Sequence, residues 1–181
     1  MPVYSITFGQ GENAPDLSPD GQRVLYKSLG EQRNTIWRVS INGGTPTQLT
    51  RDCLTLAPVI SPDGARFVAL YRADEADKWK IALFPIEGGA QPRQIFDFPD
   101  PYHQTIRWSP AGDALIYVDT RNGVANLWRY ALADGSRAQL TAFTEDRIYS
   151  LAWLDEKQLA IARGDDDYRQ PVILENFPAE K

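Results

Sequence analysis

Few side chains in this sequence have the types and spacing that catalysis requires. The chain contains one histidine, His103, and one cysteine, Cys53. A Ser-His-Asp triad would have to use His103, yet the residues around it, 101–104, carry no nucleophile motif. The sequence also lacks the Gly-x-Ser-x-Gly, Gly-x-x-x-x-Gly-Lys-Ser/Thr and His-Glu-x-x-His patterns. We therefore expect no catalytic residue in this chain and no enzymatic activity of its own.

Metal and cofactor sites have no better support in the sequence. One cysteine excludes an internal disulfide and a cysteine-cluster zinc site, and one histidine excludes a two-histidine motif. The acidic run 165–167, and Asp97 with Asp100, lack the alternating spacing of a calcium-binding loop. We interpret these carboxylates as solvated surface groups and predict no metal site and no cofactor.

The overall charge excludes two further classes of partner. The 181 residues include 19 Lys and Arg against 24 Asp and Glu, for a formal net charge of −5. Nucleic acids and anionic membranes bind basic faces, so we expect no nucleic-acid binding. No stretch approaches the roughly 18 apolar residues of a spanning helix, so we expect no membrane insertion. The first ten residues do not read as a signal peptide, which predicts a cytoplasmic protein if the chain is complete and a periplasmic one if an export signal was removed.

A four-residue turn motif recurs along the chain at intervals of 43, 48 and 45 residues. In such a turn, proline fixes one backbone angle, aspartate accepts hydrogen bonds from the backbone, and glycine takes a left-handed conformation. We predict structural hairpin turns at each copy. The copies are Ser18-Pro19-Asp20-Gly21, Ser61-Pro62-Asp63-Gly64, Ser109-Pro110-Ala111-Gly112, and a degraded fourth at 154–157.

Two further markers follow the turn in a fixed order. Ile36-Trp37 precedes Gly43-Gly44 and then 48–50, which read Gln-Leu-Thr. The third unit repeats this order with Leu127-Trp128 and a second Gln-Leu-Thr at 139–141, and the second unit has a looser version. The residues between the markers are rich in β-formers and show no sustained 3.6-residue period. Each unit therefore predicts four short strands.

Four-stranded meanders that repeat about every 45 residues are typical of β-propeller blades. The order of turn, Ile-Trp strand, glycine turn and Gln-Leu-Thr resembles the TolB-like, WD-related propeller repeat, which also occurs in the propellers of prolyl-oligopeptidase-type peptidases. The segment 149–177 resembles the closing part of C-terminal propeller domains in bacterial kinases and regulators. The predicted fold class is an all-β propeller of about four four-stranded antiparallel blades. One domain, 1–181, would hold blades at about 12–50, 51–98, 102–143 and 146–178.

The ends of the chain complement each other in this scheme. The fourth unit supplies three strands, and residues 2–8 have the pattern of the missing one. We expect residues 2–8 to complete the last blade, since an unpaired sheet edge invites association. Three arrangements stay open: a ring within one chain, an eight-bladed ring made by a homodimer, or part of a larger propeller.

Binding residues of such a scaffold are expected on its long loops. The loops from fourth to first strand and from second to third strand share one face, while the tight turns share the other. Candidate binding residues on the long-loop face are Glu12, Asn13, Tyr102, His103, Asp146, Arg147 and Tyr149.

These features predict a non-catalytic module that binds a protein partner or a small ligand. Two alternatives rest on the resemblance. One is the gating propeller of a prolyl-oligopeptidase-like hydrolase, and the other is the sensory domain of a bacterial kinase or transcriptional regulator.

Overall fold

The described part of the chain consists of β-strands joined by turns and loops. The computed structural model describes residue 7 and residues 11–29, 33–89, 91–98, 105–165, 167–175 and 177. None of these residues forms a helix that could cross a bilayer. The strands are β1 (Asn13–Leu17), β2 (Arg23–Leu29), β3 (Asn34–Ser40), β4 (Thr47–Gln48), β5 (Leu54–Ile60), β6 (Arg66–Arg72), β7 (Lys80–Pro85), β8 (Gln94–Phe96), β9 (Ile106–Trp108), β10 (Ala114–Arg121), β11 (Val124–Ala131), β12 (Arg137–Gln139), β13 (Arg147–Trp153), β14 (Leu159–Gly164) and β15 (Arg169–Leu174).

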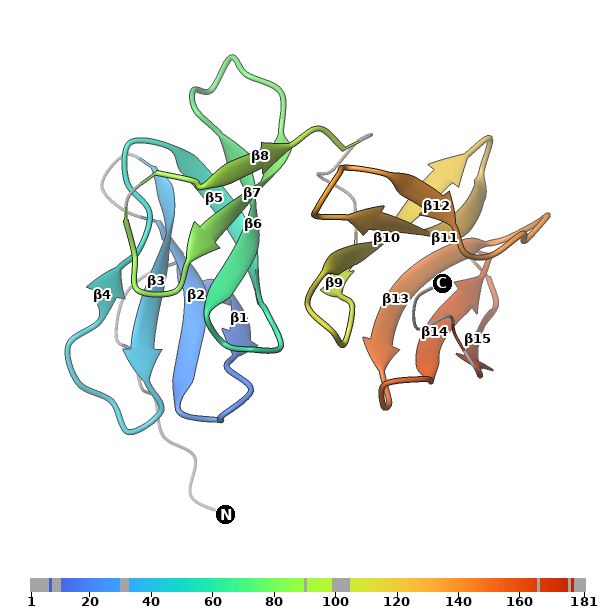
Figure 1. Ribbon diagram of the computed structural model, residues 1–181, viewed down its shortest axis with the longest axis horizontal. Coiled ribbons are helices and arrows are strands. Elements are labelled where there is room, and N and C mark those ends of the chain that lie inside the picture. The colour runs from blue at the N-terminus through green and yellow to red at the C-terminus, as the bar shows by residue number, and fades with distance from the viewer. Residues whose placement is uncertain are drawn as a thin grey trace. The chain divides into compact units, whose positions relative to one another are not determined.

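These strands form four antiparallel sheets, each a meander of consecutive neighbours (Figure 1). The first three sheets have four strands each, β1–β4, β5–β8 and β9–β12. The fourth sheet has three described strands, β13–β15. The predicted all-β fold of four antiparallel blades is therefore confirmed. The predicted completing strand, residues 2–8, lies outside the described residues except for Thr7.

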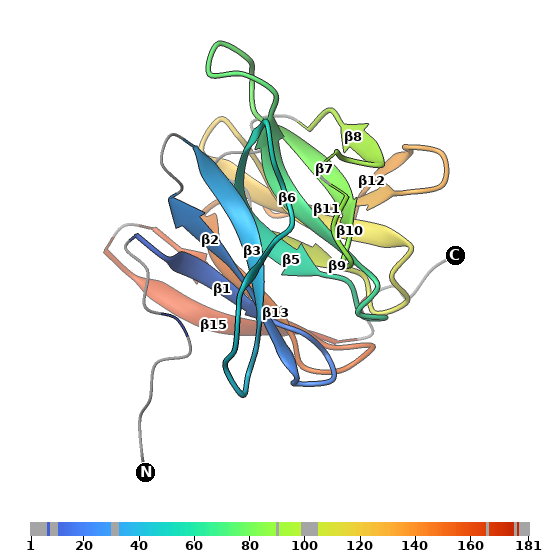
Figure 2. The same cartoon turned by 90° about the vertical axis from the view of Figure 1, so that its left-hand side faces the viewer.

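The chain divides into two compact units, residues 1–102 and 103–181, each with two of the sheets. The single domain expected from the repeats, 1–181, stays a prediction. In both views the loop 73–79, between β6 and β7, extends well beyond its sheet (Figure 1, Figure 2).

Each unit has its own apolar core between its two sheets. In the first unit β5 packs against β1, β2 and β3, and Phe67 stacks on Phe84 with ring centroids 5.2 Å apart. In the second unit Trp153 packs edge-on against Phe177 at 5.8 Å. The indole Nε1 of Trp153 also donates to the carbonyl of Trp108, 2.7 Å away, and so joins the two sheets. A single sheet exposes one apolar face, so stacking in pairs removes that face from water.

The recurring turn residues are held in hydrogen-bonded hairpins. In the second copy the Ser61 hydroxyl donates to Asp63 Oδ1 at 2.5 Å, and the same carboxylate oxygen accepts from the Ala65 N–H at 2.9 Å. Ser61 Oγ in turn accepts from the Arg66 N–H at 3.0 Å, and Gly64 has a φ of 67°. Ser18, Asp20 and Gly21 repeat this geometry in the first copy, with Pro19 inside the turn.

The third copy keeps the same geometry with a different residue. Its sequence has Ala111 where the other copies have aspartate. Asp113, which follows Gly112, takes over the role, because its Oδ1 accepts from the Ser109 hydroxyl at 2.6 Å. Gly112 again has positive φ, 74°. The carboxylate that holds the hairpin is therefore conserved in space although its position in the sequence shifts.

The Gln-Leu-Thr segments also have structural roles. Thr50 Oγ1 accepts from the Ile36 N–H at 2.9 Å, and Thr141 Oγ1 accepts from the Leu127 N–H at the same distance. These threonine hydroxyls end the pairing between the third and fourth strands, at the point where the chain leaves the sheet. The side-chain amide of Gln48 donates to the Thr50 carbonyl at 3.1 Å and closes the segment on itself.

Candidate binding face

The candidate residues of the first unit lie at the start of β1. Thr7 donates a hydrogen bond from its hydroxyl to the Glu12 carboxylate, and Asn13 is an exposed residue opposite Lys27 of β2. Tyr102 and His103 lie outside the described residues. Glu12 and Asn13 are neighbours in the sequence. Among the described residues, no other candidate from the sequence lies beside them.

Two candidate residues of the second unit take part in one arginine–aromatic cluster. The Asp146 carboxylate lies 3.2 Å from Nη2 of Arg163, and the guanidinium of Arg163 lies 4.2 Å from the ring centroid of Phe143. Next to them, the hydroxyl of Tyr149 donates to the Asp165 carbonyl at 2.9 Å, and Arg169 stacks on the Tyr149 ring at 3.8 Å. These contacts link the loop ends of β13, β14 and β15, while Nε of Arg163 is buried without a hydrogen-bond partner among the described residues. Arg147, the exposed first residue of β13, lies at the same end of the sheet.

The loop between β14 and β15 contains two described residues of the acidic run, Asp165 and Asp167. The Asp165 carboxylate accepts hydrogen bonds from the backbone N–H groups of Asp167 and Tyr168, at 2.9 and 2.7 Å. This turn leaves the Tyr168 side chain 66% exposed. Asp166 lies outside the described residues. Asp165 is thus committed to the loop backbone, and no group of three metal-ligating side chains occurs among the residues that the structure describes.

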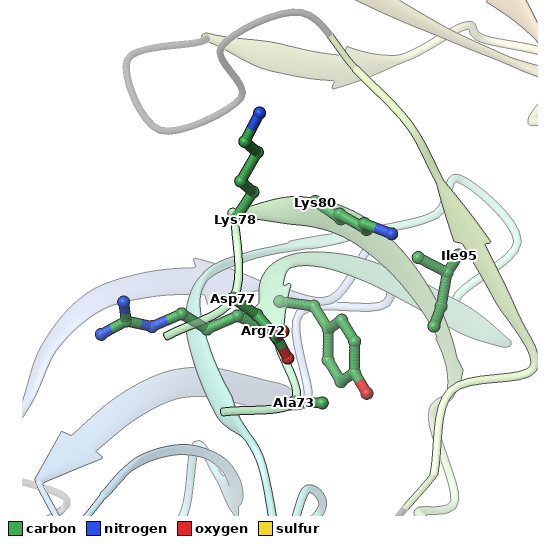
Figure 3. Close-up of a pocket in the computed structure, with 7 residues that line it drawn as sticks. Arg72, Ala73, Asp77, Lys78, Lys80 and Ile95 are labelled. Atoms are coloured by element: carbon green, nitrogen blue, oxygen red, sulfur yellow. The ribbon is translucent and has the colours of Figure 1, made fainter. Parts of the chain in front are cut away.

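A pocket of about 350 Å³ lies at the base of the β6–β7 loop in the first unit (Figure 3). This loop joins second to third strand of its blade, so the pocket belongs to the predicted long-loop face. Its lining residues were not among the candidates from sequence. They are Tyr71, Arg72, Ala73, Asp77, Lys78, Lys80 and Ile95.

Two charged residues of the pocket wall hold the loop in place. Arg72 donates from Nη1 to the Glu75 carbonyl at 2.7 Å, and its guanidinium lies 4.6 Å from the Trp79 ring centroid. Asp77 accepts from the Asp74 N–H at 3.0 Å through Oδ2. Burial, with smaller effects from the charges of Cys53 and Asp77, raises the pKa of the Tyr71 hydroxyl. Tyr71 is thus a neutral hydrogen-bonding group at neutral pH.

Two features of the sequence distinguish the loop that carries this pocket. The loop carries Lys78, Trp79 and Lys80 in a row, an aromatic residue between two cations. Lysines two residues apart on an extended segment lie on one side of it. The loop that joins β6 to β7 is also longer than the tight turns.

Another missed feature is a bulge in the first strand of both blades of the first unit. The pairing shifts register at Ala14 and at Ala57, whose φ values are 51° and 48°. Each alanine precedes a proline, and the two pairs lie 43 residues apart in the sequence. The repeated Ala-Pro dipeptide is the signal for these bulges.

Cys53 lies in the apolar core of the first unit. It is 2% exposed, and burial, followed by the nearby charge of Asp52, raises its pKa to about 11. The thiol therefore stays protonated at neutral pH, and a protonated thiol is neither a nucleophile nor a metal ligand.

Comparisons with known proteins place the chain among β-propellers. No family model matches the sequence. An uncharacterized protein of Agrobacterium fabrum is 31% identical in an alignment 123 residues long, which covers 62% of this chain and 42% of that protein. The chain therefore spans less than half the length of this curated relative.

Solved structures match over nearly the whole chain. TolB from Acinetobacter baumannii superposes with a TM-score of 0.71 at 22% identity, over 91% of this chain and 41% of that one. A TolB-like protein from Agrobacterium tumefaciens matches with a TM-score of 0.67 at 24% identity, over 91% of this chain and 58% of that one. The β-propeller domain of the Trilobed protease from Pyrococcus furiosus matches at 0.62 and 14% identity, over 91% and 55%.

These likenesses establish the fold alone. The chain is a β-propeller structure that resembles both TolB and peptidase propeller domains, and its named structural relatives include bacterial proteins.

Proposed function

We propose that the chain is a non-catalytic propeller module that binds a small ligand or a protein partner on its long-loop face. The observation that supports this most directly is that the tight turns and the long loops differ in what their polar side chains contact. The polar side chains of the tight turns form hydrogen bonds within their own turns: Asp63 accepts from the Ala65 N–H, and Asp113 accepts from the Ser109 hydroxyl. The β6–β7 loop on the other face surrounds a pocket with exposed cations.

The experiment that tests the binding face is NMR mapping on uniformly ¹⁵N-labelled protein, screened against a library of small metabolites and short peptides. We expect the perturbed amides to cluster in the long loops, such as 73–79 and 141–146. The internal control is the tight-turn face, residues 18–22 and 61–65. Perturbation confined to the tight turns would contradict the proposed face.

The absence of catalysis needs its own test. We expect no turnover of p-nitrophenyl esters or of chromogenic peptides by the purified chain. Turnover that disappears in His103→Ala, with the melting temperature unchanged, would overturn the non-catalytic assignment.

A second candidate function is the gating propeller of a prolyl-oligopeptidase-like hydrolase. It is favoured by the structural likeness to the Trilobed protease propeller domain. An α/β-hydrolase domain encoded in the same polypeptide would favour this candidate, whereas a kinase domain or a transcriptional-regulator domain would favour the sensory alternative. Binding by the long-loop face is compatible with all three, so the mapping experiment and the gene context answer separate questions.

A further inference from the structure

We propose that the pocket at the base of the β6–β7 loop binds a small organic anion, whose acidic group pairs with Lys78 and Lys80 and whose apolar part contacts Tyr71 and Ile95. This inference rests on the proposed function and narrows it, because it selects a small ligand and a location. The site lies wholly within the first unit.

The charge of the pocket comes from two uncommitted lysines. Lys78 and Lys80 are both exposed, and neither ammonium group forms an ion pair or hydrogen bond with another described residue. Arg72 and Asp77 are tied to the loop backbone and offset each other. Arg33, from the neighbouring blade, adds positive charge, because its Nη1 lies 3.5 Å from the carbonyl of Ala73. The pocket therefore has two free cationic groups, and the carboxylate among its lining residues, Asp77, accepts a hydrogen bond from the Asp74 N–H through Oδ2.

The opposite wall of the pocket is apolar. Lys80 pairs directly with Tyr71 across β6 and β7, so the two side chains are neighbours on one face of the sheet. Ile95 of β8 is 46% exposed, and Figure 3 shows the Lys80 side chain directed toward it. Arg72 extends away from this wall. A ligand with an acidic group at one end and a hydrocarbon body at the other matches this distribution.

Size and charge favour a small ligand over an acidic protein segment. A volume of about 350 Å³ falls at the lower end of the range for small-molecule sites. The tip of the same loop carries exposed acidic residues, Asp74 and Glu75, beside Asp77. An extended acidic surface would meet these carboxylates, whereas a small anion reaches the lysines at the base of the loop without contacting the tip.

The test is an NMR titration with 3-phenylpropionate and with phenyl phosphate, which distinguish a carboxylate from a phosphate ligand. The neutral isostere 3-phenylpropionamide is the matched control ligand. We expect both or one of the anions to perturb amides of residues 71–80 and 95, and we expect the amide to bind about tenfold more weakly or not at all. Raising the salt concentration should weaken anion binding, because exposed charges are screened.

Variants of the lysines and of Ile95 test which side chains of the pocket contribute to anion binding. Lys78→Gln/Lys80→Gln should raise the anion's Kd about tenfold, since each exposed ion pair contributes modestly. Lys157→Gln removes an exposed lysine from a turn of the other unit and should leave Kd unchanged. Ile95→Thr should weaken 3-phenylpropionate while sparing inorganic phosphate.

Three results would overturn the inference: no saturable binding of either anion up to about 10 mM, equal affinity for the amide, or an unchanged Kd in the double variant. If a probe bound the double variant normally and perturbed residues 141–146, this pocket would be excluded while the proposed binding face would stand. If probes perturbed only the tight turns, both proposals would fail.

Discussion

At the scale of single residues, the hairpin carboxylates show that one geometric role can be filled from two sequence positions. Asp63 lies before the turn glycine and Asp113 lies after it, yet each accepts a hydrogen bond from the serine that opens its turn. The degraded fourth copy keeps a related arrangement, in which Asp155 accepts from two backbone N–H groups. The requirement is therefore an acceptor at that point in space, and the motif in the sequence is one way to supply it.

Asp63 gives a prediction about pH. Its hydrogen bond from Ser61, and then that from the Ala65 N–H, lower the pKa of the carboxyl below its ordinary value of 3.8. The folded state thus favours the ionised form, so the contribution to stability is complete at neutral pH and is lost as the pH falls through the lowered pKa. We expect Asp63→Ala to cost about 1 kcal/mol at pH 7, a modest figure because the side chain is half exposed.

Urea unfolding between about pH 3 and pH 7 measures this effect. The difference between wild type and Asp63→Ala should shrink as the pH falls. Glu156→Ala, which removes an exposed carboxylate from the fourth turn, is the control and should change little. A difference that stays constant across this pH range would show that the carboxylate charge is not involved.

Gly164 gives a prediction about sterics. A Cβ at this position would lie 2.0 Å from the carbonyl oxygen of Tyr168, and its φ is 154°. Backbone atoms of a tight loop cannot move aside cheaply, so we expect Gly164→Ala to cost about 3 kcal/mol. Gly123→Ala is the matched control, since its φ is also positive and open space surrounds its Cβ position. The control should lose about 1 kcal/mol, and equal losses in denaturant unfolding would refute the steric account.

At the scale of elements, the bulged first strands connect the two blades of the first unit. The bulge in β1 places Asp16 beside β5, where its Oδ2 accepts from the Ile60 N–H at 2.7 Å. Ile60 is 7% exposed, so this N–H has little access to water. β1 therefore pairs with β2 of its own blade and also accepts a hydrogen bond from β5 of the next blade.

We expect Asp16→Ala to destabilise the protein by about 2 kcal/mol, because a buried N–H loses its acceptor. Asp16→Asn keeps an amide oxygen at the same place and should recover at least half of the loss. Thermal or urea unfolding of the two variants gives the comparison. Equal losses in both would indicate that the negative charge, and not the hydrogen bond, is what stabilises the contact.

The elements were the most predictable level of this structure. Trp37 and Trp128 mark the third strands of the first and third blades, and Gln-Leu-Thr marks the ends of their fourth strands, because these two blades repeat the same backbone geometry. The three-stranded fourth sheet was also foreseen, from the count of strand-like segments. Turns and strands depend on residues that are close together in the sequence, so the repeated motifs predict them directly.

The residues of the β6–β7 pocket were harder to predict from the sequence, for a physical reason. Loop residues such as Lys78 and Ile95 come together only when β6, β7 and β8 pair in register, and no repeat encodes their identity. The predicted residues Asp146 and Tyr149 do converge, but their polar groups are largely satisfied by Arg163 and by the Asp165 carbonyl. Whether these candidate residues or the β6–β7 pocket bind a ligand stays a prediction.

At the scale of the whole molecule, the question is what covers the outer edge of the fourth sheet. Among the described residues β15 has β14 as its one strand neighbour, and Ile173 of β15 is 55% exposed. The solved TolB structure that this chain resembles is more than twice as long as the matched part. The neighbouring strand would come from residues 2–8 of the same chain, from a second copy of the chain, or from further polypeptide, which are the three arrangements that the repeats leave open.

We expect the isolated 181-residue chain to associate as a dimer with a mass about twice 20.3 kDa, since an edge strand with an exposed apolar side chain pairs readily with another strand. Multi-angle light scattering after size exclusion measures the mass directly. Ile173→Lys places a charge on the edge strand and should shift the population toward 20.3 kDa, whereas Leu154→Lys, at a similarly exposed turn position, should leave the dimer intact. A wild-type chain that ran as a compact monomer would instead indicate that the chain satisfies the edge of β15 by itself, as a closed four-bladed ring does.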